Sequence, residues 1–366
     1  MKLRILLTLF FPVLGVPAGA WGETFDDLAA RAAAARDAND LPRAIEIYQQ
    51  ALRLNAQWRE GWWFLGALLY DADRYALARD ALARCVDLQP DMAPAWGLLG
   101  LSEFKTQDYD HALEHIQRSL ADTHMEPQMV RVLRYHEAVL LAHSGQFDKA
   151  IAKYAWFAGD ATPAASLLAA IGIAALREPL LPDDIPADRR DLFEAAGRAF
   201  WSVMGHDEAQ AANALQQLLN RFPASPGVHS LIGSYLLVAP PGEAVAEFRR
   251  ELDSEPGNPA AATMLACTLL NHADAAAALP YAAKAAQEAP RLSMAQYAFG
   301  LSLVETGGVA TGTEHLEQAV QLDPDNIDGH IALATAYSKA GRTVDARAER
   351  SRTVELSRGV ASHAPR

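Results

Sequence analysis

The sequence predicts an all-α protein, a right-handed α-solenoid of stacked helix-turn-helix units, and two patterns indicate it. The first is a short string that recurs after 34 residues, Trp62-x-x-Leu65-Gly66 and Trp96-x-x-Leu99-Gly100. The second is a series of three prolines at the same interval, Pro256, Pro290 and Pro324. A fixed period of this length is typical of a repeat architecture in which each unit stacks on its neighbours.

Other positions of the period recur as well, with alanine at position 20 and proline at position 32. This pattern resembles the tetratricopeptide repeat, a helix-turn-helix unit of the same length. Gly66 and Gly100 have no side chain where two helices must approach closely. On the facing helix, the small methyl groups of Ala78 and Ala112 allow the same close approach. Because each helix pair is amphipathic and cannot bury its apolar face alone, the copies are expected to stack.

Length and composition predict a folded chain with an acidic surface. The chain has 366 residues, of which 51% are hydrophobic and 21% charged, and its formal net charge is −13. Loss of Lys2 and Arg4 with a leader would make the charge −15, which opposes a diffuse attraction to nucleic acid or anionic lipid. The expected partner is therefore a protein or peptide with a neutral or basic surface, and no nucleic acid is expected.

Residues 1–20 are predicted to be an export signal. Lys2 and Arg4 precede an apolar run over residues 5–16, and Ala18-Gly19-Ala20 fits a cleavage site before Trp21. The run is too short to span a bilayer comfortably, so no stable membrane insertion is expected after cleavage. Together with the alanine-rich composition, this leader favours a bacterial protein of the periplasm or the outside. The alternative is a leader kept as an uncleaved anchor.

The two cysteines, Cys85 and Cys267, are predicted to be free thiols. Export would permit a disulfide bond between them. However, roughly five repeats separate them, and at about 10 Å per helix layer their Cα atoms cannot approach to the ~6 Å that a bridge requires. We expect both to be small, buried, apolar side chains.

A first block of repeats is predicted over residues 21–164, with about four copies. They start at Phe25, at Arg59, at Ala93 and near Arg131. The first three copies are in strict 34-residue phase. A polar loop over residues 121–129 stretches the spacing before the fourth copy.

The phase breaks in residues 165–224, which are predicted to form an irregular helical middle. An alanine- and leucine-rich helix ends before the segment 179–186, where three prolines remove amide donors and clash with the preceding helical turn. This proline-rich segment is interpreted either as a hinge between two folding blocks or as a loop packed on neighbouring helices.

A second block, residues 225–358, restores the phase with about four copies, three of which begin at Pro259, Ser293 and Ile327. Its last helix, predicted over 343–358, is rich in arginine and glutamate, as a terminal repeat in contact with water requires. Residues 359–366 are expected to be a frayed tail.

The search for catalytic motifs is mostly negative, and no cofactor is expected. The sequence has no glycine-rich phosphate or dinucleotide loop and no paired C-x-x-C. One string, His111-Ala-Leu-Glu114-His115, matches the H-x-x-E-H motif in which two helical histidines bind zinc. The same residues occupy repeat positions 19 to 23, where Ala112 must pack, so a solvated helix face is the favoured interpretation. The alternative function is a metal-dependent hydrolase that uses His111 and His115.

The favoured function is a non-catalytic scaffold or adaptor of the cell envelope. The family resemblance implies that the first helices of successive repeats line a concave groove for a peptide or a partner helix. In the tetratricopeptide family, positions 2, 5, 9, 12 and 13 of each first helix face this groove. Transferred to this chain, they imply the protein-binding residues Trp63, Tyr70, Asp71, Leu101, Phe104, Lys105, Tyr135, Val139 and His143.

Two alternatives remain for the aromatic residues of this set. A register error of one residue would make Tyr70 and Phe104 the core aromatics expected at position 11, where this chain has Leu69 and Glu103. If the rings belong to the core, the groove is expected in the second block, along Tyr297, Leu301, Ile331 and Lys339.

Overall fold

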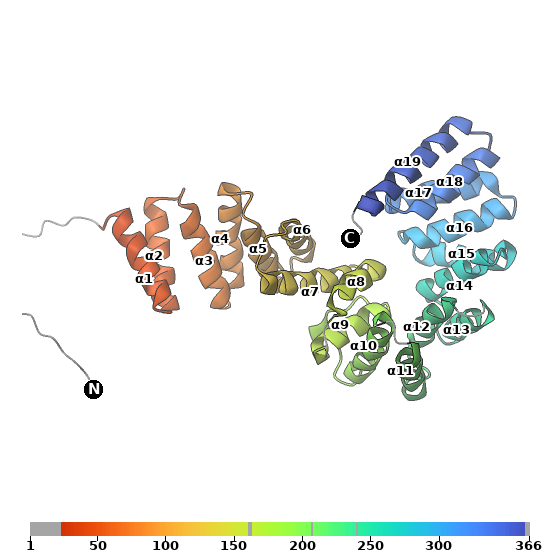
Figure 1. The fold of residues 1–366 in the computed structure, drawn as a ribbon, viewed down its shortest axis with the longest axis horizontal. Coiled ribbons are helices and arrows are strands. Elements are labelled where there is room, and N and C mark those ends of the chain that lie inside the picture. Colours follow the sequence, from red (N-terminus) through yellow and green to blue (C-terminus); the bar gives the residue numbers. More distant parts are fainter. Residues whose placement is uncertain (1–22, 160–162, 206–207, 239–240, 363–366) are drawn as a thin grey trace, which may run out of the picture. The chain divides into compact units, whose positions relative to one another are not determined.

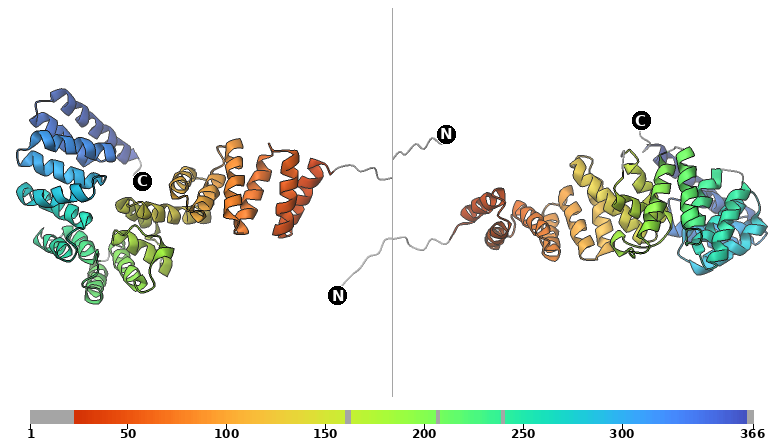
Figure 2. Two further views of the ribbon diagram at one scale, coloured as in Figure 1. Left: turned by 180° about the vertical axis from the view of Figure 1, so that it is seen from behind. Right: turned by 90° about the horizontal axis from the view of Figure 1, so that it is seen from below.

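The computed structural model describes residues 23–159, 163–205, 208–238 and 241–362. These residues form nineteen α-helices and three short 3-10 helices, with no strand among them (Figure 1). Most consecutive helices pack side by side as antiparallel pairs, which both views of Figure 2 show. The chain divides into two compact units, Met1–His136 and Glu137–Arg366. The prediction of an all-α stack of helix-turn-helix units is confirmed.

The first unit contains three regular helix pairs and the start of a fourth. The pairs are α1 (Phe25–Asp37) with α2 (Leu41–Leu54), α3 (Arg59–Asp71) with α4 (Tyr75–Leu88), and α5 (Ala93–Lys105) with α6 (Tyr109–Leu120). Their first helices begin where the 34-residue phase places the repeats. Helix α7 (Pro127–His143) begins before the predicted start near Arg131, because proline is favourable in the first turn of a helix.

The second unit holds the rest of α7 and all later elements. They are α8 (Phe147–Tyr154), η1 (Ala155–Phe157), α9 (Ala165–Ala175), η2 (Pro182–Asp184), α10 (Arg190–Met204), α11 (Glu208–Arg221), α12 (Val228–Tyr235), η3 (Leu236–Val238), α13 (Pro241–Ser254), α14 (Pro259–Asn271), α15 (Ala275–Glu288), α16 (Ser293–Glu305), α17 (Val309–Leu322), α18 (Ile327–Lys339) and α19 (Thr343–Ser362). Helices α14, α16 and α18 begin at the predicted repeat starts. Helix α19 continues past 358, so residues 359–362 are helical rather than a frayed tail.

One backbone conformation recurs at the turn inside each regular helix pair. A residue with φ between 56° and 100° occupies repeat position 15 in seven copies, namely Asn39, Asp73, Gln107, Gly145, Ala273, Gly307 and Gly341. The next residue donates its N–H to a carbonyl five residues earlier, as Arg74 does to Leu69 at 2.8 Å. This left-handed cap ends the first helix and reverses the chain.

The same turn occurs in the irregular middle, at Arg177 with φ 57°. Glu178 donates its N–H to the Ile173 carbonyl at 3.1 Å, so α9 ends in the way that the first helix of a repeat does. The second helix, α10, begins only at Arg190, whereas α2 begins two residues after its turn residue, Asn39. The middle is therefore a repeat-like helix pair with an inserted loop.

The inserted loop, which holds the three prolines of residues 179–186, packs on the fold. Leu181 and Ile185 are 7% and 5% exposed. Both carboxylate oxygens of Glu178, before the loop, pair with the guanidinium of Arg189, after it. These contacts support the packed-loop interpretation over the hinge.

In the first unit, a hydrogen bond from repeat position 4 links consecutive copies. Trp62 Nε1 donates to the Ala56 carbonyl and Trp96 Nε1 donates to the Pro90 carbonyl, both at 2.9 Å. In each case the acceptor lies six residues earlier, at the end of the preceding copy. The large side chain at position 4 therefore packs between two copies and satisfies a carbonyl of the connecting turn.

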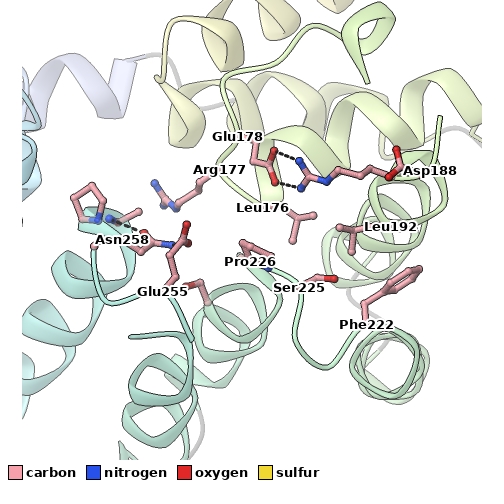
Figure 3. Close-up of a pocket in the computed structure, with 16 residues that line it drawn as sticks. Leu176, Arg177, Glu178, Asp188, Leu192, Phe222, Ser225, Pro226, Glu255 and Asn258 are labelled. Atoms are coloured by element: carbon pink, nitrogen blue, oxygen red, sulfur yellow. Dashed lines mark hydrogen bonds and ion pairs between the residues drawn. The ribbon is translucent and has the colours of Figure 1, made fainter. Parts of the chain in front are cut away.

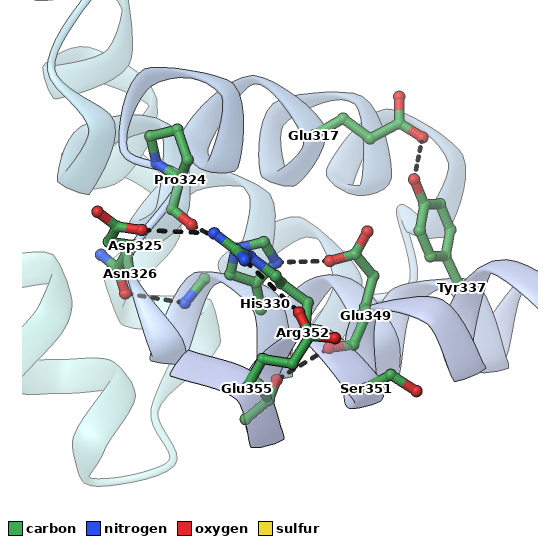
Figure 4. A network of polar contacts seen from close by, with 12 residues as sticks. Glu317, Pro324, Asp325, Asn326, His330, Tyr337, Glu349, Ser351, Arg352 and Glu355 are labelled. Carbon is green, nitrogen blue, oxygen red and sulfur yellow. Dashed lines mark hydrogen bonds and ion pairs between the residues drawn. The ribbon is translucent and has the colours of Figure 1, made fainter. Parts of the chain in front are cut away.

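In the second unit, polar side chains make the equivalent bond. Gln296 Nε2 donates to the Pro290 carbonyl at 3.0 Å, and His330 Nε2 lies 2.9 Å from the Pro324 carbonyl. Figure 4 shows that the other ring nitrogen of His330 faces α19, where Nδ1 is 2.5 Å from Oε2 of Glu349. His330 thus joins α18 to α19 and to the turn before α18.

Cys85 and Cys267 are both free thiols, as predicted, but only Cys85 is fully buried, whereas Cys267 is half-buried. Burial raises the pKa of Cys85 to about 11 and that of Cys267 to about 12. Because the thiolate is the reactive form, we expect iodoacetamide at mildly alkaline pH to label both thiols slowly in the native chain and rapidly in urea without reductant. Mass spectrometry follows the labelling. A monomer that is two protons lighter and takes up no label in urea would contradict the free-thiol state.

The predicted leader, residues 1–20, lies outside the described residues, so the export signal stays a prediction. Among the residues that the structure does describe, no helix is both long enough and apolar enough to cross a membrane.

Candidate functional site

The predicted groove residues lie on the first helices α3, α5 and α7, and most of them keep contact with solvent. Five of them are half-buried, namely Trp63, Tyr70, Phe104, Tyr135 and His143. Two are exposed, namely Asp71 and Lys105. Leu101 and Val139 are only 3% and 2% exposed. The prediction that these two residues line an open groove is therefore wrong.

The burial of Leu101 and Val139 has a local cause in each case. Helix α7 packs so closely on α5 that a Cβ on Gly97 would lie 2.8 Å from the side chain of Leu133. Leu101 is one turn after Gly97 on the same face of α5, so it is covered as well. Val139 belongs to residues 138–142 of α7, a run in the second unit that is buried all round the helix.

In the first unit, repeat position 11 is buried in the core and the next position keeps contact with solvent. Leu69 and Glu103 occupy this position, and they are 1% and 5% exposed. The residues that follow them, Tyr70 and Phe104, keep contact with solvent. The alternative in which a shift of one residue puts both rings in the core is therefore wrong.

Aromatic rings of α5 and α7 cluster on one side of the first unit. Phe104 and His136 meet edge to face, with 4.9 Å between ring centroids, and Tyr135 meets the same imidazole at 5.3 Å. The Nζ atom of Lys105 is 6.0 Å from the centroid of the Phe104 ring. Edge-to-face contacts of this kind fix the orientation of a ring while part of its surface stays accessible.

The rings of α3 are held in a similar way. Trp63 and Tyr70 both pack on the hydrophobic core of the first unit while remaining partly exposed. Tyr70 also contacts Tyr75 edge to face at 5.3 Å, and burial raises the pKa of Tyr70. Residues seven apart share a helix face, so the two α3 rings point the same way. We name Trp63, Tyr70, Phe104, Lys105 and Tyr135 the first-helix surface.

Comparison with known families decides what these helix pairs are. A model described as tetratricopeptide repeat matches residues 29–93 and 68–124. Residues 29–124 contain tetratricopeptide repeats. No curated protein sequence matches it.

Several solved structures resemble parts of the chain at low identity. MamA from Desulfovibrio magneticus RS-1 is 21% identical, with 46% of this chain and 96% of that chain covered and a TM-score of 0.41. YrrB, described as a TPR protein with an unusual peptide-binding site, is 17% identical, with 47% and 92% covered and a TM-score of 0.37. The APC/C hetero-tetramer Cut9-Hcn1 is 14% identical, with 91% and 66% covered and a TM-score of 0.42.

The third tetratricopeptide repeat carries the H-x-x-E-H string on α6. His111 Nδ1 lies 2.8 Å from Oδ1 of Asp108, and this hydrogen bond raises the pKa of His111. His115 Nδ1 lies 2.7 Å from Oε2 of Glu103, a buried carboxylate. In the described part of the chain, no group of three histidine, cysteine or carboxylate side chains could hold a metal ion. Through Nδ1, each of the two histidines is within hydrogen-bond distance of a carboxylate of its own repeat.

The tetratricopeptide-like repeats of the second unit offer a weaker surface at the alternative groove positions. Tyr297 and Leu301 on α16 are half-buried, and Ile331 on α18 is 49% exposed. Lys339 pairs with Glu305 at 2.9 Å, and a pocket of about 470 Å³ lies beside Leu301 and Glu305. The surface has a single aromatic ring among its predicted residues, so the first-helix surface is the better candidate.

A pocket of about 680 Å³ lies in the second unit, lined by the ends of α9 and α11 and the starts of α10, α12 and α14 (Figure 3). Four of its charged side chains are engaged within the fold, namely Arg177, Glu178, Arg189 and Glu255. Both carboxylate oxygens of Glu178 pair with the guanidinium of Arg189. Glu255 Oε2 accepts a hydrogen bond from Asn258 Nδ2 at 2.8 Å, and Figure 3 labels Glu178, Glu255 and Asn258. These pairs stabilise the inserted loop and the turn before α14, and we assign this pocket no ligand.

Proposed function

We propose that the chain is a non-catalytic protein-interaction scaffold whose first-helix surface binds a peptide or a helix of a partner. The observation that carries the proposal is the placement of four aromatic rings on packed helices, each ring supported by the fold and partly exposed. Rings held in this way supply much of the binding energy at protein interfaces. An apolar surface formed by helices is also the kind that accepts an amphipathic helix or an apolar peptide.

The cell envelope is the proposed setting, with export to the periplasm or the outside of a bacterium. Its support is the leader pattern of residues 1–20, with two basic residues, an apolar run and a small-residue cleavage site. A net charge of −13 favours a partner with a neutral or basic surface.

Replacing Trp63 or Tyr135 with alanine is expected to weaken partner binding by about 1–3 kcal/mol each, because each truncation removes an aromatic anchor. Partners are captured from the exported fraction with the unmodified chain and identified by mass spectrometry, and the affinity of the purified partner is then measured for each variant. Trp156→Ala is the matched control, since Trp156 is 47% exposed and lies in the second unit, outside the first-helix surface.

Both variants are expected to fold, with a stability loss below the ~3–5 kcal/mol typical of truncating a fully buried aromatic side chain. Unchanged affinity in both variants, or an equal loss in the Trp156→Ala control, would contradict the proposed site. Stability losses of several kcal/mol in both would make the rings core residues and move the groove to the surface of α16 and α18.

A further inference from the structure

The second tetratricopeptide repeat has another pocket, on a different face of α3. The pocket has a volume of about 530 Å³ and lies between α2, α3 and α4. Trp62, Leu65 and Leu69 line it, and their spacing of three and four residues puts them on one helix face. Trp63 and Tyr70 do not line the pocket. Its volume is within the range of about 300–1,000 Å³ that is usual for ligand pockets.

The third repeat shows why this pocket exists. Trp96 stands 34 residues after Trp62 and makes the same hydrogen bond to the preceding turn. His115 covers Trp96, with 4.9 Å between ring centroids, and the guanidinium carbon of Arg118 lies 3.8 Å from the centroid of the Trp96 ring. At the position of His115 the second repeat has Ala81, whose methyl group is too small to cover Trp62. The second repeat therefore has no ring over Trp62 at the position from which His115 covers Trp96.

The pocket combines an apolar floor with a basic rim. Leu77, at its edge, is 43% exposed. Arg53 and Arg84 also line the pocket, and both are exposed. The guanidinium of Arg84 lies 3.9 Å from the carboxylate of Asp87. The rim carboxylate of Asp80 already pairs with a neighbouring arginine at 3.0 Å. The local excess of positive charge contrasts with the acidic chain as a whole and complements a carboxylate.

We propose that this pocket binds a peptide segment that inserts one large apolar side chain against Trp62 and places flanking carboxylates beside Arg53 and Arg84. An aromatic or leucine side chain would occupy the space over the indole that His115 occupies in the third repeat. The planar guanidinium groups suit carboxylates, which they bind through paired N–H donors. The site goes beyond the proposed scaffold function, because no residue of the first-helix surface lines it.

The test follows the indole N–H signals of Trp62 and Trp96 in the full chain, labelled with nitrogen-15 and assigned from Trp62→Phe and Trp96→Phe. The probe is the blocked peptide acetyl-Glu-Ala-Phe-Ala-Glu-amide. Two further peptides, one with phenylalanine replaced by alanine and one with both glutamates replaced by glutamine, test the apolar side chain and the charges. Decanoate tests whether an acyl chain with a carboxylate binds instead.

We expect the parent peptide to shift the Trp62 signal in a saturable way. The Trp96 signal should stay unchanged, because His115 and Arg118 cover that ring. The alanine peptide should produce no shift, and the glutamine peptide should bind about tenfold more weakly, which corresponds to about 1.4 kcal/mol. Ala81→Leu fills the pocket and should abolish the Trp62 response. Arg84→Glu, at an exposed position, should weaken binding about tenfold without affecting the fold, which circular dichroism checks.

A Trp62 signal that does not respond to the parent peptide, a response that survives both Ala81→Leu and Arg84→Glu, or tighter binding of decanoate than of the peptide would overturn the proposal. Trp63→Ala should leave the affinity of the probe peptide unchanged. A loss of partner binding in Trp63→Ala and a loss of probe binding in Ala81→Leu are therefore separate results, and either site can fail without the other.

Discussion

Replacing Gly172 with alanine is expected to lower the free energy of unfolding by about 3 kcal/mol or more, at the upper end of the cost of overpacking. Helices α9 and α10 cross at this glycine, and a Cβ atom there would lie 1.9 Å from the carbonyl oxygen of Phe193. The obstacle is backbone, so no side chain can rotate away and the helices must separate. Gly197 meets α9 in the same way, with a Cβ position 1.8 Å from the carbonyl oxygen of Leu168.

The measurement is urea unfolding followed by circular dichroism, with Gly197→Ala as the second variant. Gly257→Ala is the control, since a Cβ on Gly257 would meet nothing within 4 Å. In an unobstructed helix interior, alanine is more stable than glycine by about 1 kcal/mol. A Gly172→Ala chain as stable as the unmodified chain, or more stable, would therefore contradict the close crossing of α9 and α10.

Replacing Glu103 with alanine is expected to destabilise the first unit by about 1–3 kcal/mol, the usual cost of leaving a buried hydrogen-bonding group without its partner. Glu103 is 5% exposed, and its Oε2 lies 2.7 Å from Nδ1 of His115. The substitution leaves His115, whose side chain is 17% exposed, beside the Trp96 ring without its carboxylate partner. His115→Ala is expected to destabilise for the reciprocal reason, since it leaves the buried carboxylate unpaired.

The double variant Glu103→Leu with His115→Ala should lose less stability than the summed losses of the single changes Glu103→Leu and His115→Ala. It copies the second repeat, which has Leu69 and Ala81 at these positions, so both polar partners are replaced at once. A double-mutant cycle measured by urea unfolding is expected to give a coupling energy of about 1–2 kcal/mol. Additive losses would mean that the two side chains do not stabilise each other.

The sequence was sufficient to predict the regular helix pairs, because repeat phase is recorded in residues that must be small. Gly66 would place a Cβ 2.6 Å from the Leu82 side chain, and Gly100 would place one 2.8 Å from that of Ile116. Close packing therefore restricts both positions to glycine, and the 34-residue period becomes visible in the sequence. Helices α3, α5, α14, α16 and α18 begin where this period places them.

The middle of the chain could not be read in the same way. Its turn residue is Arg177, a residue type that gives no sign of the left-handed conformation it adopts. The inserted loop separates α9 from α10 and hides their relation as one helix pair. The facing glycines, Gly172 and Gly197, are recognisable as partners only once the crossing of the two helices is known.

Transferring the family's groove positions to this chain identified the exposed rings of the candidate site. It did not predict which of the neighbouring groove positions are buried. Leu101 and Val139 were misplaced because their exposure depends on how closely neighbouring helices pack, which a repeat position does not determine. The pair of Glu103 and His115 was missed although one signal was present. A carboxylate at a position expected to be core requires a buried partner, and a search for that partner on the second helix of the same repeat would have found His115.

Photo-crosslinking from within the first-helix surface tests the scaffold proposal most directly. A photo-reactive phenylalanine analogue replaces Trp63 in one chain and Tyr135 in another, and Trp156 in a control chain, and each is expressed in full and irradiated in cells. We predict covalent adducts with the same partner protein from positions 63 and 135, and no such adduct from position 156. Adducts of that partner from position 156 alone, or different proteins captured at positions 63 and 135, would contradict binding at this surface.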